Sequence, residues 1–79
     1  MMTYQQFKAH VVSVRQRINK DETDQEVRDE RMRTHKIILA GLFAELPGNI
    51  TKLSQVPEKE LWPLYQRLVR DEKLHKFKS

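Results

Sequence analysis

The sequence predicts a small all-α domain of three main helices, with one helix buried at the centre and short connecting turns. Hydrophobic residues recur at spacings of three and four, which is the helical period, and capping signals precede two of these segments. No stretch alternates as a strand does, and two glycines leave little room for hairpin turns. A chain of 79 residues forms one domain at most. The helices are expected at about residues 3–19, 24–46 and 62–76.

The first helix is expected to begin at a capping box formed by Thr3 and Gln6, whose side chains satisfy backbone groups of the first turn. The hydrophobic stripe on one face of this helix is formed by Tyr4, Phe7, Val11, Val14 and Ile18. Such a stripe usually packs on the core, which is the interpretation we favour. The alternative is a seam between two copies of the chain, because the stripe has the spacing of a short coiled coil.

The second helix is expected to begin at another capping box, formed by Thr23 and Glu26. Its first half is charged and should lie in solvent, whereas residues 37–46 carry hydrophobic side chains on all sides. That pattern predicts a core helix surrounded by the other helices. Gly41 lies inside this segment, and we attribute it to a close helix–helix approach, with a kink as the alternative. Pro47 ends the helix because proline cannot continue one.

The third helix is harder to place, because Pro57 predicts a single turn at 57–61 and Pro63 conflicts with a helix interior. We therefore expect this helix to begin at Trp62 or Pro63. The connector before it is expected to pack down through Ile50, Leu53 and Val56. Trp62 and Tyr65 are candidate partner-binding residues, since both residue types are enriched at binding hot spots. Their helical spacing also fits a role in the core, which we favour.

The residue types argue against an enzyme. The three histidines, His10, His35 and His75, are isolated in the sequence and are expected to be surface or half-buried. The chain has no cysteine, no phosphate-binding glycine loop and no nucleophile motif, so we predict no metal and no cofactor. The longest apolar stretch falls short of the roughly 20 residues that a membrane-spanning helix needs, and we find no signal peptide. We therefore expect a cytoplasmic protein with no membrane partner.

The basic residues are the main functional indication. The chain has a net charge of +4, and lysine and arginine side chains bind the phosphate groups of nucleic acids. The candidate nucleic-acid contacts are Lys8, Arg15 and Arg17 on the first helix and Arg28, Arg31, Arg33 and Lys36 on the second. Acidic residues between positions 22 and 30 dilute this charge. On charge alone, a solvated helix face is the slightly favoured interpretation.

A resemblance to a known family adds to this reading. From Arg31 to Phe43 the chain resembles the small conjugal-transfer accessory proteins of the TraD/MobC type, which are found beside plasmid relaxases. The matching residues are Arg33, Thr34, Lys36, Ile37, Leu39, Gly41 and Leu42. His35 stands where a basic residue is usual, and the resemblance covers less than a third of the chain. It implies an auxiliary protein that helps a relaxase to process DNA at the transfer origin.

Two functions are therefore expected, and they differ in the partner. The first is a non-enzymatic DNA-binding auxiliary protein of a mobile genetic element, which assists a relaxase and contacts DNA mainly through phosphates. The second is a small protein-binding adaptor or inhibitor that acts through an amphipathic helical face. The expected partners are DNA, a larger protein such as a relaxase, and a second copy of this short chain. One contiguous basic patch would favour the first function, and scattered basic residues the second.

Overall fold

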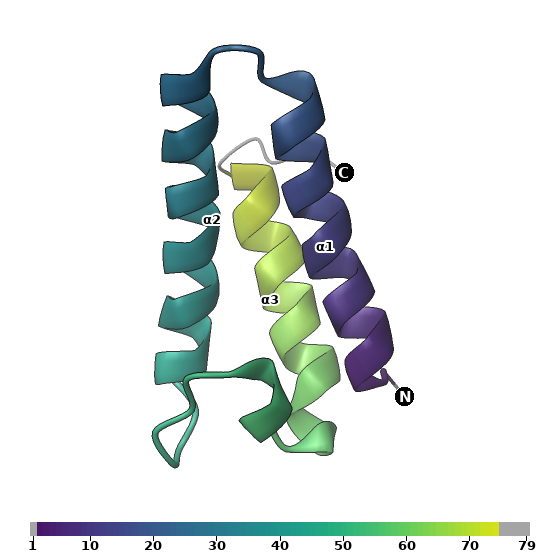
Figure 1. Ribbon diagram of the computed structural model, residues 1–79. Helices are drawn as coiled ribbons and strands as arrows, with labels where there is room; N and C mark the ends of the chain where they lie inside the picture. Colours follow the sequence, from purple (N-terminus) through teal and green to yellow (C-terminus); the bar gives the residue numbers. More distant parts are fainter. Residues whose placement is uncertain (1, 75–79) are drawn as a thin grey trace.

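The computed structural model describes residues 2–74 and shows a three-helix bundle (Figure 1). The helices are α1 (Tyr4–Asp21), α2 (Gln25–Ala44) and α3 (Leu61–Leu74), and two short 3-10 turns lie between α2 and α3, η1 (Leu53–Gln55) and η2 (Glu58–Glu60). α1 and α2 are antiparallel, and α3 lies against both and runs parallel to α1. The described residues contain no strand, which confirms the predicted all-α class. The predicted end of the third helix, at residues 75 and 76, lies outside the described residues.

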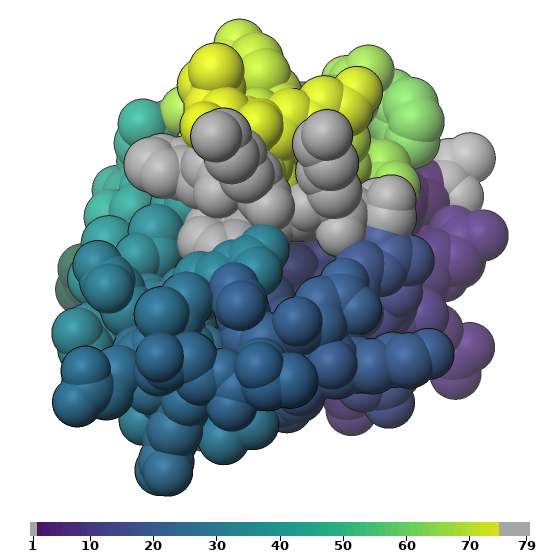
Figure 2. All heavy atoms as spheres, turned by 90° about the horizontal axis from the view of Figure 1, so that it is seen from above, coloured from purple at the N-terminus to yellow at the C-terminus, as the bar shows by residue number. Residues whose placement is uncertain are grey.

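Figure 2 shows the outer surface of the bundle from above, turned by 90° from the view of Figure 1. The turn that joins α1 to α2 lies on one side of this view, and the last described turn of α3 lies on the opposite side. Each of the three helices has buried residues on one side and exposed residues on the other. None of the helices within residues 2–74 is long and apolar enough to span a membrane.

α1 begins at the predicted capping box. The backbone N–H of Gln6 donates to the Thr3 hydroxyl, and the Gln6 side chain accepts from the Thr3 N–H. Four residues of the stripe are buried against α2 and α3: Phe7, Val11, Val14 and Ile18. Tyr4 lies at the edge of the core, where its hydroxyl donates to the Val56 carbonyl. The core-facing interpretation of the stripe is confirmed, because this chain's own helices cover it.

α2 begins one residue later than the predicted capping box implies. The N-cap is Asp24, whose carboxylate accepts from the N–H groups of Glu26 and Val27 at 2.9 and 3.3 Å. The prediction of Thr23 as the cap is wrong. Both residue types can cap a helix, but the Asp24 carboxylate also carries the negative charge that a helix N-terminus favours.

The prediction that residues 37–46 form a helix surrounded by protein is also wrong. One stripe of α2 is buried, through His35, Leu39, Leu42 and Phe43. Ile37 is 64% exposed, and α2 continues unbroken through Gly41, where an added Cβ would meet nothing within 4 Å. No close helix approach therefore explains this glycine. A bundle of three helices has too few elements to cover every side of one of them.

The connector between α2 and α3 closes one end of the bundle. Gly48 and Asn49 have positive φ angles of 97° and 53°, which turn the chain back toward the core after α2. Ile50 and Val56 are buried and Leu53 is half-buried, as the spacing predicted. At the outer edge, the Arg67 guanidinium of α3 pairs with Glu45 at the end of α2.

α3 follows η2 directly, and this placement explains Pro63. The helix begins at Leu61, so Pro63 is its third residue. The first four N–H groups of a helix have no partner within the helix, so a proline there removes no hydrogen bond. Leu61, Leu64 and Leu68 are buried and complete the core.

Candidate binding surfaces

The seven basic residues predicted to contact nucleic acid differ in their surroundings. Arg31 is engaged in an ion pair, in which its guanidinium lies 2.7 Å from the Glu22 carboxylate. Arg28 is half-buried, whereas Arg33 and Lys36 are exposed. Arg33 is six residues from Leu39, so it lies about 120° around α2 from the side that faces α1. Lys36 is one turn before Leu39 and lies nearer to that side.

Two of the predicted residues meet in a groove between α1 and α2. Lys8 and Arg15 line this groove together with Lys52, which the sequence analysis did not single out. The groove has a volume of about 520 Å³, and its apolar lining is formed by Tyr4, Val11, Leu39, Phe43 and Leu53. The Lys52 N–H donates to the Gln55 side chain at 3.1 Å, which fixes the backbone at this wall. We call this surface the basic groove.

Arg17 belongs to a different side of α1. It lies two residues after Arg15, which places it about 200° further around the helix. Arg17 is half-buried, and its Nη1 atom is buried without a hydrogen-bond partner among the described residues. The structure therefore brings Lys8 and Arg15 to one groove, and Arg17, Arg31 and Arg33 do not line it.

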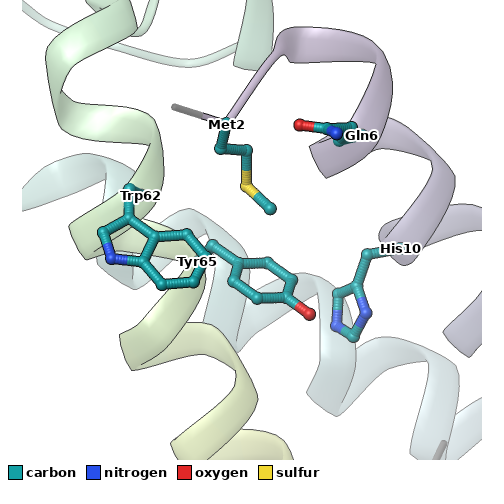
Figure 3. Close-up of a pocket in the computed structure, with 5 residues that line it drawn as sticks. All are labelled: Met2, Gln6, His10, Trp62 and Tyr65. Carbon is teal, nitrogen blue, oxygen red and sulfur yellow. The ribbon is translucent and has the colours of Figure 1, made fainter.

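A second concave surface lies between α1 and α3 (Figure 3). This aromatic pocket has a volume of about 570 Å³ and is lined by Met2, Gln6, His10, Trp62 and Tyr65. The Trp62 and Tyr65 rings are stacked, with their centroids 5.7 Å apart and an angle of 23° between their planes. Trp62 is 51% exposed, so the prediction that it fills the core is wrong. Tyr65 is half-buried, and its ring also packs against Phe7 of the core.

His10, which lines the aromatic pocket, also makes a polar contact with α3. His10 Nε2 lies 2.8 Å from Glu72 Oε2, and the His10 ring meets the Tyr65 ring edge-on, with centroids 5.0 Å apart. Glu72 is only 3% exposed, and its Oε1 atom has no hydrogen-bond partner among the described residues. Sequence reasoning treated the acids as solvated and missed Glu72. Its spacing of four from Leu68 and eight from Leu64 places it on the buried side of α3 and was a usable signal.

His35 is buried in α2 rather than at the surface. Burial lowers its pKa, and the Arg15 charge lowers it further, while the Glu72 carboxylate acts in the opposite direction. The expectation of a surface or half-buried histidine is therefore wrong at this position. Within residues 2–74, no group of three histidine or acidic side chains is arranged to hold a metal ion.

Comparison with known proteins returned no family model, no curated protein and no solved structure that matches this chain. The resemblance of residues 31–43 to the TraD/MobC type therefore stays a prediction from the sequence.

Proposed function

We propose that this protein is a non-enzymatic helical module that binds a partner protein, and that the aromatic pocket is its main contact surface. The observation that carries the proposal is the half-exposed Trp62 stacked on Tyr65. Large aromatic side chains at a concave surface supply much of the binding energy in protein interfaces. Tyr65 is anchored in the core, so the pair forms a rigid surface that loses little entropy on binding.

The distribution of the basic residues favours a protein over DNA as the main partner. A DNA-binding face needs several cations along one phosphate backbone. Arg31 is engaged by Glu22, and of the seven predicted residues two, Lys8 and Arg15, line the basic groove. The absence of the other five predicted residues from this groove supports a protein partner over DNA.

A DNA-binding accessory protein is the second candidate function. It is favoured by the net charge of +4 and by the three cations at the basic groove, Lys8, Arg15 and Lys52. The sequence resemblance implies the same role, in which the protein assists a relaxase at the transfer origin of a mobile element. Phosphate contacts at these residues would give weak binding to any DNA sequence, with a strong dependence on salt.

Partner capture with a matched pair of variants tests the first candidate. Immobilised wild-type protein is incubated with lysate of the source organism, and the retained proteins are quantified beside those on Trp62→Ala and Gln66→Ala. Gln66 is also exposed on α3 but does not line the pocket, so it controls for the loss of any surface side chain. We expect a partner that Gln66→Ala retains and Trp62→Ala loses. A partner set that does not depend on Trp62 would refute the proposal.

Fluorescence polarisation against a short DNA duplex tests the second candidate. Affinity is measured over a salt series that begins at ~50 mM. Electrostatic binding is strongest at this lowest salt concentration. If DNA is the partner, Lys8→Ala with Lys52→Ala should flatten the salt dependence by about two units of slope and weaken binding to all sequences alike. Absence of binding at ~50 mM salt would remove this candidate.

A further inference from the structure

The basic groove combines an apolar floor with three cations. None of these residues lines the aromatic pocket. Val11, Leu39 and Phe43, each at most 9% exposed, form the floor where α1 and α2 meet. Tyr4 and Leu53 are more exposed and add apolar surface at the walls. Lys8 and Arg15 border it from α1, and Lys52 borders it from the connector. No carboxylate is among the described residues that line the groove, so its cations face a ligand without a counter-charge. The groove is thus apolar at its base and positive at its edges.

We propose that the basic groove binds an acidic amphipathic helix of a partner protein. Apolar side chains of that helix would enter the groove and lie against the Tyr4 ring and Leu53, and its carboxylates would pair with Lys8, Arg15 and Lys52. Docking a helix into an apolar groove is a common mode of protein recognition. The inference deepens the proposed function and rests on it, since both require a partner protein, but it concerns a separate surface.

The spacing of the cations matches a helical ligand. Lys8 and Arg15 are seven residues apart on α1, which places them two turns, or about 10 Å, apart along its axis. Carboxylates seven residues apart on a ligand helix have the same separation. Arg15 lines the groove as a half-buried side chain, and its guanidinium is the cation at this side of the groove. A carboxylate that bonds to a guanidinium forms one of the stronger hydrogen bonds in proteins.

The same groove is poorly suited to nucleic acid. Single-stranded nucleic acids stack successive bases on several exposed aromatic rings, but the described lining of the groove offers one such ring, Tyr4, beside the buried Phe43. The Tyr4 hydroxyl is held by the Val56 carbonyl, which fixes this side chain in the wall of the groove. The other floor residues are aliphatic, and phosphate groups gain nothing from an apolar floor. The positive edges of the groove and its apolar lining therefore favour a peptide that carries both acidic and apolar side chains.

Two labelled peptides serve as probes in a polarisation assay. The first is a ~18-residue helical peptide, long enough to hold a helix in water, with leucines on one face and flanking glutamates. The second has lysine in place of every glutamate. We expect the acidic peptide to bind and the basic one not to bind. Lys8→Glu with Lys52→Glu should weaken binding by about tenfold or more, since each lost charge pair removes affinity.

A second double variant distinguishes the effect of the groove cations on peptide affinity from the effect of the protein's net charge. Lys20→Glu with Lys73→Glu changes the charge by the same amount at exposed positions that do not line the groove. Wild-type affinity in this variant supports the proposal, and an equal loss in both double variants overturns it. Failure of the acidic peptide to bind at high micromolar concentration also overturns it. Stronger binding of single-stranded or duplex DNA, with the same dependence on Lys8 and Lys52, would reassign the groove to nucleic acid.

The Trp62→Ala variant separates this inference from the proposed function. Trp62 does not line the basic groove, so this variant should bind the acidic peptide as the wild type does. Capture of a partner that depends on Trp62, without any peptide binding at the groove, would overturn only the groove proposal. Peptide binding at the groove without Trp62-dependent capture would instead refute the role of the aromatic pocket.

Discussion

His35 is a titratable side chain in a place that water does not reach. It is 1% exposed, and charged or titratable groups from all three helices act on it: Arg15 and His10 of α1, Lys36 of α2 and Glu72 of α3. Burial is the largest effect and favours the neutral ring. A neutral buried histidine makes the folded state bind fewer protons than the unfolded chain below pH ~6.5, the ordinary histidine pKa.

The stability of the protein should therefore fall as the pH is lowered. Because the folded-state pKa of His35 is below that of the unfolded chain, the unfolded state takes up the proton first and is favoured as the pH drops below ~6.5. We expect the urea midpoint at pH ~5.5 to lie below that at pH ~7, and His35→Gln to reduce this difference. A difference that the substitution leaves unchanged would assign the pH dependence to other groups.

At the scale of the helix, α2 shows two features that pattern reading did not resolve. Its start is fixed by Asp24 and not Thr23, and its apolar second half has an exposed side that includes Ile37 and Gly41. Substitutions at Asp24 and Gly41 test these two features. Both residues are exposed, so the expected changes in stability are small.

Gly41→Ala should stabilise the protein. The glycine lies within a regular helix, and an alanine Cβ there meets nothing within 4 Å. Alanine in an exposed helix position is favoured over glycine by about 0.4–1 kcal/mol, mainly because the unfolded chain loses freedom. We expect a higher thermal midpoint for this variant. A lower midpoint would mean that a contact restricts this position after all.

Asp24→Ala and Thr23→Ala should differ in their effects. The Asp24 carboxylate accepts hydrogen bonds from two backbone N–H groups. Removing this carboxylate should lower the free energy of unfolding by about 1 kcal/mol. Thr23 is exposed and outside the helix, so its truncation should change stability by less than about 0.5 kcal/mol. Denaturant titration of the two variants distinguishes these values. A larger loss for Thr23→Ala would restore the cap that the sequence alone predicted.

The limits of sequence reasoning at this scale have a physical cause. Local signals, such as the Thr3 capping box and the spacing of Phe7 and Val11, depend on neighbours in the sequence and were predicted correctly. Which side of α2 is covered depends on the number of other helices, and an apolar segment does not reveal that number. Trp62 was misplaced for the same reason: its spacing fits the core, but its direction on α3 opens to the aromatic pocket.

The whole molecule depends on a core of few side chains. Leu42→Ala and Phe43→Ala should each lower the unfolding free energy by about 2–5 kcal/mol, because both residues are buried where the three helices meet. A domain of this size has little more stability than that to lose. Ile37→Ala is the matched control, since this neighbouring residue is exposed and should change stability little. Thermal unfolding of the three variants checks the ranking, and a loss at Ile37 equal to that at Leu42 would contradict it.

At this scale the sequence predicted the class and the three helices but not the two concave surfaces. Both surfaces combine residues distant in the chain, such as His10 with Tyr65 and Lys8 with Lys52. Lys8 and Arg15 were predicted as cations for phosphate, but their apolar surroundings become visible only when α2 packs beside them. The buried Glu72 that meets His10 is likewise a product of the packing of α3 on α1.

The parallel packing of α3 on α1 has a consequence for the synthesis of the chain. Phe7 belongs to the same hydrophobic cluster as Leu61 and Leu68, so α1 shares its core with α3, which follows it in the chain. Chains leave the ribosome from the N-terminus, so α1 and α2 emerge with much of their apolar surface uncovered. The nascent chain should therefore remain unfolded and sensitive to proteases until α3 has emerged, and it folds as a unit only then.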